Sequence, residues 1–195
     1  ILVSTIQEVL QRVNAMPTQY GWATKLTKLT PSHWGMILGH VGFAVSLIGM
    51  TLVSNFELER DVRMNYGDEV KIAGYDIKFS NVSTVQGANY SADRGIFDVY
   101  LDGDFVVHLE PEKRFYPVSG MTMTEAGIHT TLIRDLFIAL GEPLDKGAWA
   151  VRVYYKPFVI WIWLGAGIMA IGGICSMLDK RYRMKKLARF GVQAA

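Results

Sequence analysis

Residues Trp34–Phe56 read WGMILGHVGFAVSLIGMTLVSNF, and this stretch decides how the chain is organised. No Asp, Glu, Lys or Arg occurs between Lys28 and Glu57. At about 1.5 Å per residue, a helix over this stretch is long enough to cross a hydrocarbon core of about 30 Å. The sequence therefore predicts a transmembrane helix here.

One ionisable side chain, His40, lies inside this apolar stretch, about six residues and roughly 9 Å from Trp34. An imidazole at that depth is unfavourable unless it faces protein, a pore or a metal centre. Small residues also recur at a 4-3-4-3 spacing, which predicts a smooth helix face that another helix or a flat cofactor can approach closely. They are Gly35, Gly39, Gly42, Ser46 and Gly49.

A second uncharged stretch of 21 residues, Phe158–Leu178, follows about one hundred more polar residues. Its small residues Ala166, Ala170 and Gly173 predict that the two spans pack on each other or on further helices. We expect an α+β membrane protein in which two transmembrane helices flank a small antiparallel β domain, a barrel or sandwich of OB-like type.

The distribution of charge predicts the orientation of these parts. Residues 1–33 carry a net charge of +2, residues 57–156 carry −5 and residues 179–195 carry +5. Basic flanks on short segments favour two cytoplasmic termini and an exported middle. We expect a cytoplasmic amphipathic helix and linker (1–33), a transmembrane helix (34–56), an exported β-rich domain (57–156), a second transmembrane helix (157–178) and a basic cytoplasmic tail (179–195).

Smaller elements follow from local patterns. Alternation predicts five strands, and Asp102-Gly103-Asp104 predicts a hairpin between two of them. Apolar residues from Ile128 to Leu140 fit a helical spacing, with Gly141 as its stop, so one helix is predicted there. Residues 1–15 predict an amphipathic helix, residues 16–33 a linker, and Ser32 an N-cap for the first span. The five strands are 69–73, 76–82, 96–101, 105–109 and 148–154.

Among the four histidines, His40 is the best candidate for chemistry, because a neutral imidazole is a common axial ligand of haem iron. A hydrogen bond to a neighbouring helix is the alternative, and the residues alone leave both open. His33 is interpreted as a solvated anchor, His108 as a strand residue facing water, and His129 as an exposed residue at the start of the predicted helix.

Other kinds of site have little support. The sequence contains no nucleophile elbow and no phosphate-cradling glycine loop. The segment Glu110-Pro-Glu-Lys-Arg114 is interpreted as a solvated loop, and the basic tail as a membrane anchor rather than a nucleic-acid-binding segment. The only cysteine, Cys175, falls in the second span, so no disulfide is expected in the exported domain.

Six longer motifs follow one another along nearly the whole chain. The first three are Trp34-Gly-Met-x-x-x-His40, Glu57-x-Glu-Arg-Asp-Val62 and Pro111-Glu-Lys-Arg-Phe-Tyr-Pro117. The others are Met121-Thr-Met-Thr-Glu-Ala126, Arg134-Asp-Leu-x-x-Ala-Leu-Gly-Glu142 and Tyr154-Tyr-Lys-Pro-Phe-x-x-Trp-Ile-Trp-Leu-Gly165. Together they resemble the C-terminal part of the CcmF/NrfE haem lyase family of system I cytochrome c maturation.

The resemblance implies a role in joining the vinyl groups of haem to the Cys-x-x-Cys-His thiols of an unfolded apocytochrome c. It also implies a haem b held in the membrane by two transmembrane histidines, of which His40 matches the second by its place in the motif. The implied partners are a periplasmic haem chaperone, apocytochrome c with its thiol-presenting factors, and quinol as electron donor. The implied location is the bacterial inner membrane, with the central domain in the periplasm.

Three features of the family are absent from this sequence: the Trp-rich WWD segment, its flanking periplasmic histidines and the first transmembrane ligand. The second axial ligand and the substrate-haem site are therefore expected outside this chain, either before Ile1 in a longer protein or in a separate subunit. The chain is not expected to be active alone. The rival hypothesis is a non-catalytic membrane assembly subunit in which His40 is only structural.

Overall fold

The computed structural model describes residues 2–17 and 19–179, apart from the side chain of Lys146. Its contacts divide the chain into two compact units, which are described separately. The helical unit comprises residues 1–50 and 161–195, and the β domain comprises Thr51–Ile160. The basic tail that the sequence predicts lies, after Asp179, outside the described residues.

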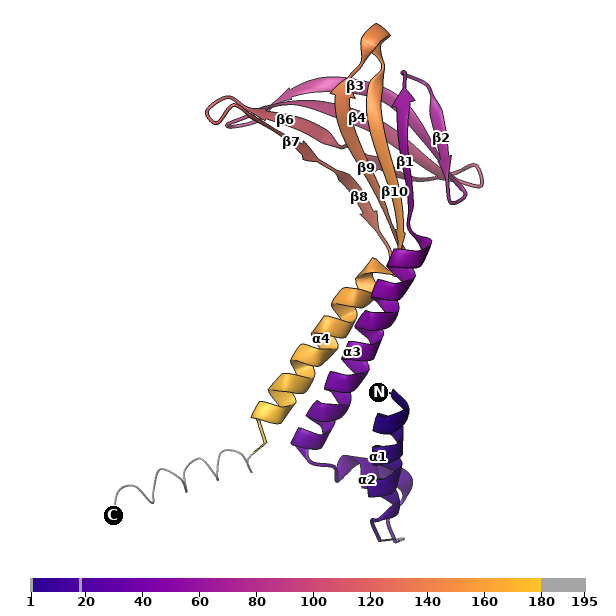
Figure 1. Cartoon of the computed structure of the whole chain (residues 1–195), viewed down its shortest axis with the longest axis vertical. Coiled ribbons are helices and arrows are strands. Elements are labelled where there is room, and N and C mark those ends of the chain that lie inside the picture. The colour runs from indigo at the N-terminus through magenta and orange to yellow at the C-terminus, as the bar shows by residue number, and fades with distance from the viewer. Residues whose placement is uncertain (1, 18, 180–195) are drawn as a thin grey trace, which may run out of the picture. The chain divides into compact units, whose positions relative to one another are not determined.

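Four α-helices are present in the described residues (Figure 1): α1 (Leu2–Asn14), α2 (Trp22–Thr27), α3 (Pro31–Phe56) and α4 (Val159–Met177). The predicted amphipathic helix and both long apolar helices are confirmed as helices. The predicted linker, by contrast, contains the short helix α2.

Helix α3 begins three residues earlier than predicted, and its cap differs. Pro31 is the first helical residue, where its missing N–H leaves no hydrogen bond unmade. The residue before it, Thr30, accepts a hydrogen bond at its Oγ1 from the His33 N–H at 3.3 Å. Ser32 lies inside the helix and donates its N–H to Asp179 Oδ2 at 3.2 Å, so the prediction of Ser32 as N-cap is wrong.

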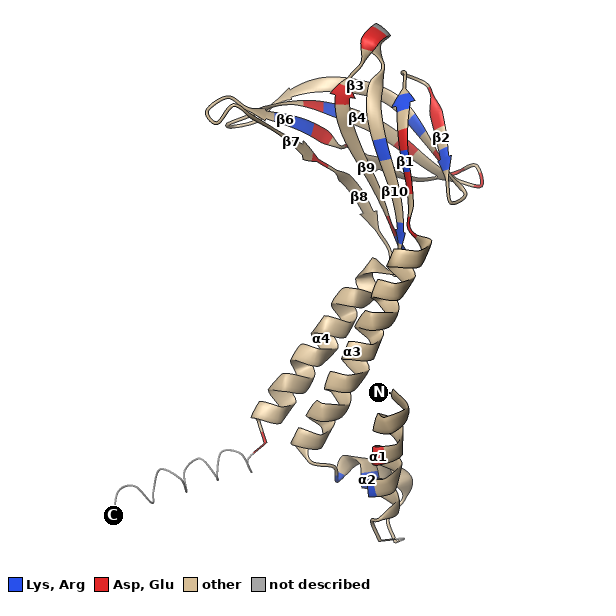
Figure 2. Cartoon of the chain, viewed as in Figure 1, with Lys and Arg blue, Asp and Glu red and all other residues tan. Residues whose placement is uncertain are grey.

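Helices α3 and α4 are long and apolar enough to cross a membrane. Only 11% of the residues in the most apolar window of each are buried, whereas the core helix of a soluble protein is mostly buried. Figure 2 shows no Lys, Arg, Asp or Glu along either helix. An exposed, uncharged helical surface of this length fits a lipid environment.

Within the helical unit, α3 and α4 pack through glycines. A Cβ built on Gly42 would lie 2.5 Å from the Gly165 carbonyl oxygen, and one on Gly35 would lie 2.5 Å from the Gly172 carbonyl oxygen. Ser46 Oγ donates to the Ile162 carbonyl at 3.1 Å. The predicted small-residue face of α3 is confirmed at these positions, because the backbones approach more closely than any side chain would allow.

The contact face of α4 differs from the predicted one. Gly165 and Gly172 face α3, while a Cβ on Gly173 would meet nothing within 4 Å. Ala166 and Ala170 are exposed. The face of Ala166, Ala170 and Gly173 is therefore not the one that contacts α3, from which it is rotated by about one residue, or about 100° around the helix. The alternative that this face packs on further helices stays a prediction.

The β domain is a sandwich of two antiparallel sheets. One sheet has the strand order β1-β10-β9-β8, and the other has the order β2-β3-β4-β6-β7 with β5 paired to β4. With two apolar helices at the ends of the domain, this architecture confirms the predicted fold class, as a sandwich rather than a closed barrel. The strands are β1 (Leu58–Met64), β2 (Glu69–Ile72), β3 (Tyr75–Gln86), β4 (Ser91–Leu101), β5 (Asp104–Leu109), β6 (Glu112–Tyr116), β7 (Met121–Glu125), β8 (Gly127–Thr130), β9 (Arg134–Pro143) and β10 (Trp149–Pro157).

The core lies between the two sheets. Phe79 and Phe97 are fully buried and stack with ring centroids 4.7 Å apart. Alternate residues of β9 and β10, such as Ile138 and Val153, point into this core and are also fully buried. The predicted β4–β5 hairpin is confirmed, with Asp102 and Gly103 both at positive φ in its turn.

The helix predicted over Ile128–Leu140 does not exist. The segment forms β8, a turn and most of β9. Its apolar residues fit both periodicities, but Ile138 falls outside the helical stripe and is buried in the core. Pairing of β9 with β8 on one side and β10 on the other decides between them, because it buries Leu136, Ile138 and Leu140 on one face.

Candidate functional site

His40 is exposed on α3, on the side away from α4. The contacts with α4 come from Gly35, Gly42 and Gly49, which are seven residues apart. At about 100° per residue, His40, two positions before Gly42, projects about 160° away from that contact face. It therefore takes no part in packing the two long helices together.

The surroundings of His40 are apolar. Met36 and Phe43 lie one turn to either side of it on the same face of the helix. Among residues 2–17 and 19–179, the imidazole forms no hydrogen bond or ion pair. A polar ring on an apolar, lipid-suited helix needs a partner, and the described part of the chain supplies none.

His33 lies seven residues before His40, near the start of α3, and is only 6% exposed. Its Nδ1 is 3.8 Å from Glu8 Oε1 on α1, and its Nε2 has no hydrogen-bond partner among the described residues. The interpretation of His33 as a solvated anchor is therefore wrong, because Glu8 and its helix lie beside it.

The other two histidines lie in the β domain. His108 on β5 is exposed, as predicted, and its Nδ1 lies close to Asp98 Oδ1 on the neighbouring strand β4. His129 lies on β8 and is partly buried, so its assignment to an exposed helix start is wrong. Its Nδ1 is 2.9 Å from an Arg134 guanidinium nitrogen, and burial, followed by that positive charge, lowers the pKa of His129.

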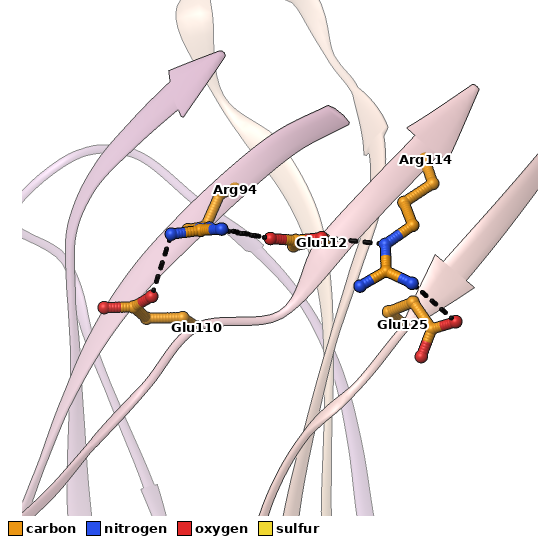
Figure 3. A network of polar contacts seen from close by, with 5 residues as sticks. All are labelled: Arg94, Glu110, Glu112, Arg114 and Glu125. Carbon is orange, nitrogen blue, oxygen red and sulfur yellow. Dashed lines mark hydrogen bonds and ion pairs between the residues drawn. The ribbon is translucent and has the colours of Figure 1, made fainter. Parts of the chain in front are cut away.

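Figure 3 shows a network of ionised side chains across β4, β6 and β7. Glu112 accepts hydrogen bonds from Arg94 Nε at 2.7 Å and from Arg114 Nε at 2.8 Å. Arg94 also pairs with Glu110, and Arg114 with Glu125. The Arg114 hydrogen bond holds the pKa of Glu112 below its usual value. The interpretation of 110–114 as a solvated loop is wrong, since Glu112 is buried on a strand.

Sequence reasoning also missed a groove of about 620 Å³ on the outer face of the sheet that contains β9 and β10. Its lining includes the small residues Ala139 and Ala150, and Phe137 and Tyr154, whose rings meet edge to face with centroids 5.3 Å apart. Arg152 binds Asp61 through two hydrogen bonds nearby. Such a groove can accept an apolar group flanked by polar partners.

The described residues contain no group of three His, Cys, Asp or Glu side chains that could hold a metal ion by themselves. A metal centre with one ligand from this chain and another from elsewhere fits the isolated, exposed imidazole of His40.

The comparisons with known proteins agree with this fold. The family model described as the CcmF C-terminal beta-sandwich matches residues 55–157, which include every strand of the β domain. The chain belongs to the CcmF family. The cytochrome c-type biogenesis protein CcmF of Pseudomonas aeruginosa is 50% identical over 161 residues, which are 83% of this chain and 24% of the relative. The CcmF of Haemophilus influenzae is 48% identical over 162 residues, 83% of this chain and 25% of the relative.

A solved structure, "Cytochrome c Heme Lyase CcmF", matches with a TM-score of 0.65 over 91% of this chain and 29% of that chain. At 16% identity, this match supports the CcmF fold. The chain spans about a quarter of the length of the CcmF relatives that it matches. The region in common is the C-terminal part of CcmF, as the resemblance of the sequence motifs indicates.

Proposed function

We propose that this chain is the C-terminal portion of a membrane haem lyase of cytochrome c maturation, in which His40 is one axial ligand of a haem b. The observation that carries the proposal is the position of His40: exposed on an apolar helix, away from α4, and without a partner among the described residues. The names of the relatives, cytochrome c-type biogenesis protein and cytochrome c heme lyase, support the general function.

His40 would bind the iron through the lone pair of one ring nitrogen, with the second ligand supplied by a part of the lyase outside this chain. The haem, when bound, supplies one-electron redox chemistry, and in this proposal it relays electrons from quinol. The chain's own contribution is to hold the imidazole on a rigid helix and to exclude water with apolar neighbours such as Met36 and Phe43.

The β domain, in this proposal, lies in the periplasm close to where haem is attached to apocytochrome c, and meets the haem chaperone and the thiol-presenting factors there. Charge supports this orientation, because the two short flanking segments, 1–33 and 179–195, carry net charges of +2 and +5. In this proposal His40 would be the one ligand that this chain gives the haem iron, and the rest of the lyase would supply the other.

The test is to produce the chain together with the remainder of the lyase and to record the absorption spectrum of the purified, reduced complex. Wild-type protein should show a b-type spectrum with two histidine ligands, and His40→Ala should lose it while the complex stays assembled. The matched control is His108→Ala, which removes an exposed histidine of the β domain and should leave the spectrum unchanged. An unchanged spectrum in His40→Ala would favour an assembly subunit in which this histidine is only structural.

A further inference from the structure

The turn between β8 and β9 carries two exposed aliphatic side chains. We name the residues Thr131–Ile133 the tip loop. Leu132 is 70% exposed and Ile133 is 63% exposed. Tight turns that face water usually carry Gly, Asn or Asp, and two other hairpins of this domain follow that rule with Ala73-Gly74 and Asp102-Gly103. The tip loop departs from it, which indicates surroundings other than water.

The tip loop lies beside the residue that leads into α4. The Phe158 N–H donates to the Ile133 carbonyl at 3.0 Å, and α4 begins at the next residue, Val159. The paired positions Arg134 and Pro157 hold the ends of β9 and β10 together at the same place. Figure 1 shows β8, β9 and β10 converging at this end of the β domain. Because α4 is a candidate membrane span, the residue that the tip loop contacts directly precedes that span.

Arg134, the charged residue that follows the tip loop in sequence, is held away from the tip. Arg134 follows Ile133 directly but is only 4% exposed. Its guanidinium donates from Nε to the Tyr75 hydroxyl at 2.8 Å and stacks 4.6 Å from the centre of the Tyr75 ring. It also donates to the His129 carbonyl at 3.2 Å. The Arg134 side chain is thus directed into the domain and not towards the surface where Leu132 and Ile133 lie.

Hydrogen bonds between Thr131 and Arg134 close the turn. The Thr131 N–H and hydroxyl both donate to the Arg134 carbonyl, at 2.9 and 2.8 Å. The Arg134 N–H donates to Thr131 Oγ1 at 3.1 Å. A turn whose closing hydrogen bonds are internal can enter the lipid–water boundary without leaving these donors and acceptors unpaired.

We propose that the tip loop inserts Leu132 and Ile133 into the lipid–water boundary beside the start of α4 and so fixes the β domain against the membrane surface. The inference rests on α4 crossing the membrane and is independent of the role of His40. The lipid surface is the occupant that the position next to Phe158 specifies, because a span and its adjacent loop share the same interface.

The experiment uses the whole chain reconstituted in lipid vesicles, in a Cys175→Ser background so that a single introduced thiol can be labelled. An environment-sensitive fluorophore is attached to Leu132→Cys or, in a second variant, to Ile133→Cys. The matched control is Val118→Cys, an aliphatic residue that is 98% exposed in the turn between β6 and β7. The ten residues from Met121 to Thr130, which comprise β7, Ala126 and β8, separate the two turns by up to about 30 Å at roughly 3.3 Å per residue.

Vesicles containing lipids with a nitroxide near the top of the acyl chain then report contact with the boundary. The proposal predicts blue-shifted emission and intensity roughly halved by the nitroxide at positions 132 and 133, with little change at 118. Absence of quenching at both 132 and 133 would overturn it, whether the loop faces water or another protein. Equal quenching at position 118 would also overturn it, because the β domain would then contact the lipid at several places and not specifically through the tip loop.

Discussion

The contact between α3 and α4 allows a sharp prediction, because neighbouring glycines of α3 differ in what surrounds them. A Cβ added at Gly42 would lie 2.5 Å from the Gly165 carbonyl oxygen and 2.8 Å from the Met169 backbone nitrogen. A Cβ added at Gly39 would meet nothing within 4 Å. We therefore predict that Gly42→Ala weakens the association of the two helices and that Gly39→Ala does not.

The size of the expected loss of stability in Gly42→Ala follows from the distances at the helix contact. An ordinary Cβ contact is 3.4 Å or longer, so the helices must separate by about 0.9 Å at Gly42 to accept the methyl group. The obstructing atoms belong to the backbone and cannot rotate away, and overpacking of this kind costs about 1–3 kcal/mol. Both substitutions also gain about 0.5–1 kcal/mol of helix preference. The two variants should thus differ by about 1–3 kcal/mol, with Gly39→Ala equal to or more stable than wild type.

The assay is an SDS titration of the detergent-solubilised chain, read by the rate at which a maleimide modifies Cys175. This residue is the chain's only thiol and is partly buried on α4. Gly42→Ala should expose it at lower SDS than wild type, and Gly39→Ala should not. If both variants expose Cys175 at the same SDS fraction, the glycine contact does not hold the helices together and the reasoning is refuted.

Three further predictions concern the β domain, each measured by denaturant unfolding of the detergent-solubilised chain. Glu112→Gln should destabilise it by about 2–4 kcal/mol, because two arginines lose a buried charged acceptor, whereas Glu110→Gln, at an exposed ion pair, should cost under about 1 kcal/mol. Equal losses would contradict this. Ala73→Asn should stabilise by up to about 1 kcal/mol, because Ala73 has φ of 49° in a tight turn before Gly74; a loss of stability would argue against that turn. His129 has a pKa lowered below 6.5 by burial and by Arg134, so the unfolded state binds more protons and stability should fall as the pH drops below about 6.5. His129→Gln should flatten that dependence, and an unchanged pH profile would contradict the assignment.

The long apolar helices were predictable because a span of uncharged residues has one plausible structure in a membrane. Their mutual contact was predictable on α3, where Gly35, Gly42 and Gly49 recur at seven residues. On α4, small residues occur on more than one face, so composition could not identify Gly165 and Gly172 as the contact positions. That choice depends on the partner helix.

The β domain was predictable as antiparallel and sandwich-like, but half of its strands were not. Strand β9 is paired on both sides, and its sequence carries outward-facing apolar residues such as Phe137 in addition to the core residues, which imitates a helical stripe. Strand β6 carries Glu112 and Arg114 on one face, a charged pattern that resembles a loop until its partners are known. In both segments, pairing with strands distant in the sequence determines that a strand forms.

His40 could be singled out from the sequence, since a lone imidazole in an apolar span is rare and unfavourable without a partner. Its orientation away from α4 required the structure. The Arg134–Tyr75–His129 cluster could not be predicted, because Tyr75 is 59 residues from Arg134 and joins it only through the fold.

The central claim is that the His40 imidazole binds haem iron, and chemical rescue tests it most directly. The complex of this chain with the remainder of the lyase is purified as wild type and as His40→Gly, with and without imidazole in the buffer, and haem b is measured per assembled complex. The account predicts loss of haem b in His40→Gly and its recovery when free imidazole replaces the missing ring. Full haem b content in His40→Gly without imidazole would contradict it.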